Sequence, residues 1–101
     1  ERIAMMKKNA IVINVARGAV CDEAALCAAV ADGRIGAIGV DVYSKEPFGT
    51  DSPYAAVAGL PNVLLTPHMA WGSLEARNRC IAEIAENIKS YVGGGSRSRK
   101  V

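Results

Sequence analysis

The sequence predicts an α/β fold, one half of a doubly wound parallel sheet with flanking helices, built from three strands and a long C-terminal helix. Two observations support this prediction. Short runs of apolar and β-branched residues alternate with stretches of helical spacing, in the order strand, helix, strand, loop, strand, helix. Right-handed crossovers between parallel strands are the most economical arrangement for elements in this order.

The first two elements are a strand and the helix that follows it. Residues 10–15 form a continuous apolar run, which is typical of a strand covered on both faces of a parallel sheet. Gly18 permits the turn after this strand. Asp22 is expected to cap a helix that extends to about Ala31, and the pair Asp32–Gly33 is expected to end it.

The second and third strands are separated by a long connection. Residues 35–42 are predicted to form a second buried strand, and residues 63–65 a third, short one. The polar connection over residues 44–62, with a short turn expected at 53–57, has ~20 residues and is longer than most connections within a domain. This length indicates a functional loop.

The two ends of the chain differ in character. Ser73 is expected to cap a helix that runs to about Val92, whose apolar residues keep the spacing of one helical face. Residues 93–101 are predicted to be a flexible tail, so that residues 1–92 form the domain. Residues 1–8 resemble the end of a helix, since two lysines stand where a helix C-terminus favours cations.

Composition excludes several classes of function. The chain has 101 residues, of which 50% are hydrophobic and 22% are charged, as in an ordinary globular domain. The net charge of +2 gives no basic face for nucleic acid. No apolar run approaches the ~20 residues of a membrane span, and the first residues do not resemble a signal peptide.

Metal binding is not expected from the cysteines and the single histidine. Cys21, Cys27 and Cys80 are odd in number and irregularly spaced, so they form neither a disulfide framework nor a CxxC pair. His68 alone cannot build a multi-histidine zinc site. The cysteines are therefore expected to be small apolar residues in a reducing compartment, and the location is expected to be cytoplasmic.

Charged side chains follow all three predicted strands. Arg17 follows the first, Glu46 lies beyond the second, and His68 follows the third. The carboxyl ends of parallel strands meet at one edge of a sheet, where ligands bind. A histidine can exchange a proton near neutral pH, and a carboxylate on its other nitrogen fixes the tautomer and favours the imidazolium. An arginine presents a planar fork that matches a carboxylate, so this set could bind a 2-oxo acid and protonate its carbonyl.

The segments around these residues resemble a known family. They are Ile13-Asn14-Val15-Ala16-Arg17-Gly18, Asp22-Glu23 with Leu26, Gly39-Val40-Asp41-Val42-Tyr43 with Glu46-Pro47, Pro61-Asn62-Val63, and Thr66-Pro67-His68 with Ala70. With this spacing the chain resembles the D-isomer-specific 2-hydroxyacid dehydrogenases from about Met5 to Tyr91. The resemblance implies the second half of a Rossmann-type domain that binds NAD, with NADP not excluded. It also implies hydride transfer between that cofactor and a small 2-oxo or 2-hydroxy acid.

The resemblance implies roles for individual residues. Arg17 would bind the substrate and polarise its carbonyl, His68 would donate the proton, and Glu46 would pair with His68. The residues implied to contact the cofactor are Val15, Ala16, Arg17, Asp41, His68, Ala70 and Trp71. Glutamate at position 46 favours a hydroxyacid dehydrogenase over the formate dehydrogenase branch, which has glutamine. A tryptophan at position 71, after His68 and Ala70, resembles the motif of glycerate dehydrogenase and hydroxypyruvate reductase relatives. Packing of the aromatic ring accounts for this residue equally well.

Part of the family pattern is missing, which leaves two hypotheses. The dinucleotide fingerprint G-x-G-x-x-G does not occur in this sequence. The chain could be a piece of an active dehydrogenase whose N-terminal part lies elsewhere, inactive on its own. It could instead be a catalytically inactive fragment that acts as a self-associating or interaction module, because an exposed sheet edge and an uncovered helix face favour partners. A homodimer is the expected assembly.

Overall fold

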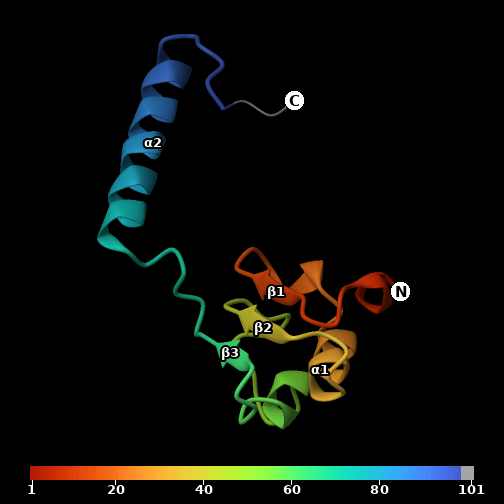
Figure 1. Cartoon of the computed structure of the whole chain (residues 1–101). Helices are drawn as coiled ribbons and strands as arrows, with labels where there is room; N and C mark the ends of the chain where they lie inside the picture. The colour runs from red at the N-terminus through yellow and green to blue at the C-terminus, as the bar shows by residue number, and fades with distance from the viewer. Residues whose placement is uncertain (99–101) are drawn as a thin grey trace. The chain divides into compact units, whose positions relative to one another are not determined.

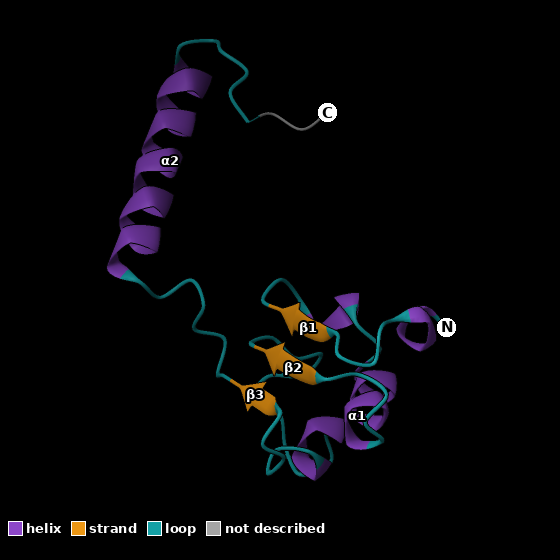
Figure 2. Ribbon diagram, viewed as in Figure 1, coloured by secondary structure: helices purple, strands orange, loops and turns teal. Residues whose placement is uncertain are grey.

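The computed structural model describes residues 1–98 and divides into two compact units, Glu1–Ala70 and a second that begins at Trp71 (Figure 1). The elements follow the predicted order (Figure 2). They are β1 (Ile11–Asn14), α1 (Glu23–Ala31), β2 (Ala37–Val40), β3 (Val63–Leu65) and α2 (Leu74–Val92), with short 3-10 helices at Arg2–Met5, Gly18–Val20 and Pro53–Ala56.

The three strands form one parallel sheet in the order β1-β2-β3. Ile13 pairs with Gly39, and Val40 pairs with Leu65. The strands predicted over residues 10–15 and 35–42 are shorter in the structure, because their flanking residues enter the turns that lead to and from the sheet. The third strand has the predicted bounds. The predicted α/β fold with a parallel sheet is confirmed.

The helix between the first two strands begins and ends where the sequence predicts. The Asp22 side chain accepts a hydrogen bond from the backbone N–H of Ala25 at 3.0 Å and so caps α1. Gly33 adopts a φ of 65°, the left-handed conformation that ends a helix without steric cost only at glycine. Local chemistry therefore determines both ends of this crossover helix.

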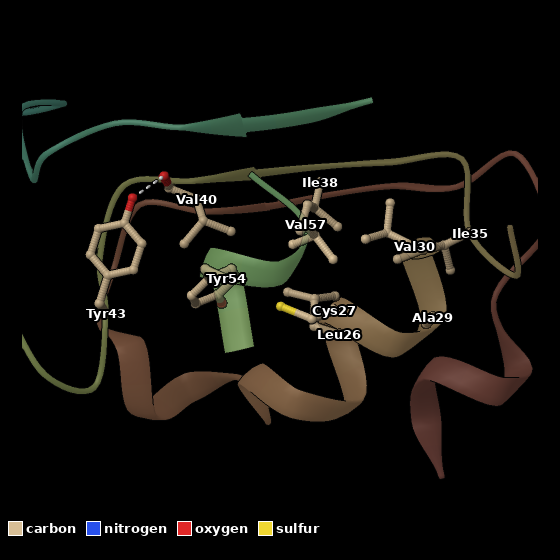
Figure 3. Packing of buried hydrophobic residues seen from close by; sticks show 10 residues of the cluster. All are labelled: Leu26, Cys27, Ala29, Val30, Ile35, Ile38, Val40, Tyr43, Tyr54 and Val57. Carbon is tan, nitrogen blue, oxygen red and sulfur yellow. Dashed lines mark hydrogen bonds between the residues drawn. The ribbon is translucent and has the colours of Figure 1, made fainter. Parts of the chain in front are cut away.

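The hydrophobic core lies between α1 and one face of the sheet. Leu26 and Val30 of α1 belong to one cluster with Ile38 and Val40 of β2, and Figure 3 shows these side chains facing one another. Tyr54, which has 0% of its surface exposed, enters the same cluster from the long connection. That connection is therefore part of the core as well as a loop.

The opposite face of the sheet is open. Ile11, Ile13 and Leu64 are 68%, 69% and 65% exposed, whereas Ile38 and Val40 on the core side are buried. Within the unit Glu1–Ala70 the first strand is therefore covered on one face only, and the predicted cover on its second face is not provided by that unit. The physical reason is that α1 and the Pro53–Ala56 turn both belong to the covered side, and side chains alternate between the two faces of a strand.

The first residues form a shorter helix than their composition predicts. Arg2–Met5 is one turn of 3-10 helix, and it ends before the two lysines that suggested a helix C-terminus. Within this turn, Ile3 packs against the core cluster.

The second unit begins at Trp71 and contains α2. The Ser73 hydroxyl accepts from the N–H of Ala76 at 3.1 Å, so the predicted cap is confirmed. In the predicted tail, residues 93–101, Arg97 pairs with Glu83 at 2.7 Å. The part of that tail over residues 99–101 lies outside the described residues.

Candidate active site

The candidate site lies at the carboxyl ends of the three strands, within the unit Glu1–Ala70. Three segments follow these strand ends: residues 15–18 after β1, 41–46 after β2, and 66–70 after β3. Since the strands are parallel and adjacent, these segments meet along one edge of the sheet, which we call the rim.

The centre of the rim is a pair between His68 and Glu46. Nδ1 of His68 lies 2.8 Å from Oε2 of Glu46, and their side chains are 38% and 36% exposed. The other carboxylate oxygen, Oε1, accepts a hydrogen bond from the backbone N–H of Tyr43 at 2.9 Å. Hydrogen bonds from His68 and from this N–H hold the pKa of Glu46 below its ordinary value. Glu46 is thus an anion that orients the imidazole.

Arg17 lies within electrostatic reach of this pair. The positive charges of His68 and Arg17 contribute further to the lowered pKa of Glu46. The guanidinium is exposed and donates from Nη1 to the carbonyl of Ala16 at 2.7 Å. The structure therefore brings His68 and Glu46 into contact, and it places Arg17 in the loop after β1 at the same rim.

Two residues shape the loop that carries Arg17. The buried Asn14 side chain accepts from the N–H of Ala16 at 3.1 Å and donates to the carbonyl of Arg17 at 2.9 Å. A Cβ on Gly18 would lie 2.2 Å from the carbonyl carbon of Tyr43, so only glycine allows the loops after β1 and β2 to approach this closely. The sequence reasoning missed Asn14, whose signal is a polar residue at the end of an apolar strand.

Asp41 is the buried acid of the rim, with 3% of its surface exposed. Its Oδ1 accepts from the Thr66 hydroxyl at 2.6 Å and from the N–H of Met69 at 2.9 Å, and its Oδ2 accepts from the N–H of Ala70 at 2.9 Å. The Thr66 hydroxyl is the main cause that holds the pKa of Asp41 below its ordinary value, against the opposing effect of burial. Asp41 is therefore bound to the loop after β3.

The loop after β3 is also held by Tyr43. The Tyr43 hydroxyl donates to the carbonyl of Thr66 at 2.8 Å, and it also lies 3.2 Å from the carbonyl of Val40 (Figure 3). Burial raises the pKa of Tyr43. Tyr43 and Thr66 are further residues that the sequence reasoning missed, because their hydrogen bonds join strand ends that lie 23 or more positions apart in the chain.

A cavity of about 380 Å³ adjoins the His68–Glu46 pair. Its walls include the apolar side chains of Tyr43, Phe48 and Leu65. Three of the remaining predicted residues lie at the margins of the site: Val15 and Ala16 are exposed after β1, and Ala70 is exposed at the end of its unit. Trp71, which is 62% exposed, is the first residue of the second unit.

Among the described residues 1–98, no group of three or more histidine, cysteine, aspartate or glutamate side chains could hold a metal ion. The helices of that part of the chain are also too short or too polar to span a membrane.

A parallel sheet with an acid–base pair at its carboxyl rim places the chain in the doubly wound class of ligand-binding domains. Comparison with known families then gives the particular family. Residues 1–70 match the family described as "D-isomer specific 2-hydroxyacid dehydrogenase, NAD binding domain". The chain belongs to this family, as the motifs predicted.

Individual relatives agree with this assignment. Glycerate dehydrogenase of Methylorubrum extorquens is 44% identical over 94 residues, which are 93% of this chain and 30% of that protein. The solved D-isomer specific 2-hydroxyacid dehydrogenase of Xanthobacter autotrophicus, in complex with NADPH and MES, is 38% identical with a TM-score of 0.77, over 99% of this chain and 39% of that one. D-lactate dehydrogenase of Lactobacillus jensenii, solved with NAD⁺, is 29% identical with a TM-score of 0.74, over 99% and 33%.

These comparisons also show how much of its relatives this chain covers and which cofactor the family binds. The chain spans less than a third of the length of three curated relatives that it matches, at 30%, 30% and 28% of their lengths. The family domain binds NAD, and the two solved relatives hold NAD⁺ and NADPH, so the predicted cofactor, NAD with NADP not excluded, is confirmed at the level of the family.

Proposed function

We propose that the chain is the second half of the cofactor-binding domain of an NAD(P)-dependent dehydrogenase that interconverts a small 2-oxo acid and its D-2-hydroxy acid. Residues 1–92 make up this half-domain and its return helix, and residues 93–101 are its tail. The observation that carries the proposal is the 2.8 Å contact between His68 and Glu46 at the rim of a domain of this family.

His68 and Glu46 supply the acid–base chemistry. Since Nδ1 of His68 faces Glu46, Nε2 is the nitrogen that gives a proton to the carbonyl oxygen during reduction. Glu46 holds the imidazole in that orientation. Like any carboxylate with an unraised pKa, Glu46 is anionic at neutral pH, as this role requires, and its hydrogen bonds lower its pKa further.

Arg17 binds the carboxylate of the 2-oxo acid. Its guanidinium is exposed on the same rim, and a planar fork of donors matches a carboxylate in a bidentate manner. A positive charge at this position also stabilises the negative charge that develops on the carbonyl oxygen. Arg17 therefore orients the substrate and assists its reduction.

The residues at the rim fit a nicotinamide. The group supplies a hydride to the carbonyl carbon when it is bound. Val15 and Ala16 offer exposed apolar surface after β1, and Oδ2 of Asp41 accepts one hydrogen bond in the structure where a carboxylate oxygen has capacity for two. The full set that we propose to contact the cofactor is Val15, Ala16, Arg17, Asp41, His68, Ala70 and Trp71.

The substrate is a small 2-oxo acid, and hydroxypyruvate is our first candidate because the relative at 44% identity is a glycerate dehydrogenase. The test is oxidation of NADH and NADPH by the intact protein with hydroxypyruvate, glyoxylate and pyruvate in parallel. Turnover with at least one acid supports the proposal, and no turnover with any acid and either cofactor overturns it. The isolated 101-residue chain is expected to show negligible turnover in the same assay.

A second candidate function is self-association without catalysis. The observation that favours it is the open apolar face of the sheet, formed by Ile11, Ile13 and Leu64. On this proposal the chain forms a homodimer in the cytoplasm. Sedimentation of the isolated chain over a range of concentrations, alongside the turnover assay, distinguishes it from the dehydrogenase.

A further inference from the structure

The loop that carries His68 is attached to the sheet on both sides of that residue. Asp41, at the end of β2, binds the Thr66 hydroxyl at 2.6 Å before His68, and the N–H groups of Met69 and Ala70 at 2.9 Å after it. All three bonds converge on one carboxylate. Asp41 therefore fixes the loop on both sides of His68.

The backbone of His68 needs such support. Its φ is +53°, in the left-handed region that a residue with a Cβ adopts only where its surroundings hold it there. The N–H of His68 donates to the carbonyl of Thr66 at 3.1 Å, and the same carbonyl accepts from the Tyr43 hydroxyl at 2.8 Å. Thr66 thus anchors the loop through its side chain and its backbone at once.

Burial makes these bonds consequential. Asp41 is 3% exposed, and a buried carboxylate requires donors to replace the water it has lost. The Thr66 hydroxyl is one of three donors, so its removal leaves Oδ1 with the N–H of Met69 alone. The same removal leaves the Asp41 carboxylate intact and substitutes none of the residues assigned to the cofactor.

We propose that Asp41 and Thr66 together are positioning residues for the reaction: they hold residues 66–70 in the conformation that directs the His68 imidazole at Glu46 before any ligand binds. The role in the reaction rests on the proposed function. It goes beyond the cofactor contact proposed for Asp41, because it assigns a task to the Thr66 hydroxyl and to the bonds between the two residues.

Kinetics of the intact protein provide the first test. Thr66→Val has nearly the same shape without the hydroxyl, and it is expected to lower kcat by about 10- to 100-fold, the range that a misplacement of about an ångström costs. The Kd for NADH and the KM for the 2-oxo acid are expected to change less than kcat, since Val15, Ala16 and Arg17 of the proposed binding set lie on another loop. Thr66→Ser retains the hydroxyl and is expected to recover most of kcat. The matched control is Thr50→Val, at an exposed threonine in the long connection, which is expected to have wild-type kinetics.

The tautomer of His68 provides a second test that does not require activity. The sequence has one histidine, so the ring nitrogen signals in an NMR spectrum of the 101-residue chain belong to it. The contact with Glu46 is expected to place the proton of the neutral ring on Nδ1, the reverse of the preference of free histidine. Thr66→Val and the positive control Glu46→Ala are both expected to restore the Nε2 form, and Thr66→Ser is expected to keep the Nδ1 form.

The two tests separate the possible failures. Wild-type kcat and an unchanged tautomer in Thr66→Val overturn the positioning role. A loss of NADH affinity as large as the loss of kcat also overturns it, because the hydroxyl would then serve the cofactor site. An inactive wild-type protein overturns the proposed function alone, and the tautomer of the Thr66→Val chain still decides whether the loop is held as we propose.

Discussion

The rim and the open face of the sheet differ in how far their groups have partners within the unit Glu1–Ala70. Polar groups at the rim have hydrogen-bond partners, whereas apolar side chains on the open face lack cover. At the rim, the carboxylates of Asp41 and Glu46 and the amide of Asn14 all have hydrogen-bond partners within the same 70-residue unit. On the open face, Ile11 and Ile13 remain more than two thirds exposed. The difference teaches that the acid–base geometry is a local property of the unit Glu1–Ala70, whereas the second apolar surface of its sheet is not buried by residues of that unit.

The largest effect at the rim is expected from removal of the His68 imidazole. His68→Ala in the intact protein is expected to lower kcat by about 10²–10⁴-fold, the contribution of general acid–base catalysis. The Kd for NADH is expected to change far less, since the proton donor acts on the substrate. Stopped-flow and steady-state measurements with hydroxypyruvate would show this split. A kcat within threefold of wild type would contradict the role of His68 as proton donor.

The next largest effect is expected from Arg17. Arg17→Ala is expected to lower kcat/KM by roughly 10²-fold, with a higher KM for the 2-oxo acid, because it loses a charged bidentate contact and a stabilising charge. Arg17→Lys is expected to recover little, since an ammonium cannot form the planar fork.

The matched control for Arg17 is Arg34→Ala. Arg34 is an exposed arginine in the turn between α1 and β2, at the amino ends of the strands and away from the rim. Its removal takes away the same charge from the same unit, so it is expected to leave kcat/KM unchanged. Equal losses in the two variants would show that Arg17 acts through net charge and not as a substrate ligand.

A third prediction tests whether the open face of the sheet drives self-association. Ile13→Lys is expected to weaken self-association of the isolated chain by at least about tenfold in Kd, because a charge at the centre of an apolar patch must be desolvated on contact. Sedimentation equilibrium measures this directly. Val20→Lys is the control, since Val20 is 70% exposed in the 3-10 helix after Arg17 and lies outside the patch. A wild-type chain that remains monomeric at high concentration would contradict the proposal.

The extent to which the sequence predicts these two regions follows from the range of the interactions. The cap at Asp22 and the stop at Gly33 depend on residues within one helical turn, and both were predicted correctly. The rim residues Arg17, Glu46 and His68 were found from their places after strands and from the family motifs. Their partners Thr66 and Tyr43 were missed, because a hydroxyl that bonds across 25 positions has no local pattern.

For the open face, the sequence predicted a contact that the unit Glu1–Ala70 does not make. A continuous apolar run is the same whether its second face is covered by the same chain or by another surface, so composition alone predicted burial on both sides. The structure separates these cases, since Ile11 and Ile13 lack cover among the described residues of their unit. Periodicity therefore predicts what a strand is suited to contact, and not which polypeptide provides the contact.

The smallest expected effect concerns acid stability and compares a rim carboxylate with a surface one. Asp41 and Glu86 both have a lowered pKa, the first chiefly through the Thr66 hydroxyl and the second chiefly through Lys89. A group whose pKa is lowered on folding stabilises the folded state above its ordinary pKa of about 4, and this contribution is lost as the pH falls through the lowered value. Asp41→Asn is therefore expected to lower the urea midpoint at pH 7 and to approach wild type below about pH 4.

Glu86→Gln is expected to change the midpoint little at any pH, because its exposed pair with Lys89 is screened by solvent. Parallel pH profiles for Asp41→Asn and wild type would mean that the carboxylate charge at the rim contributes nothing to the fold that presents His68.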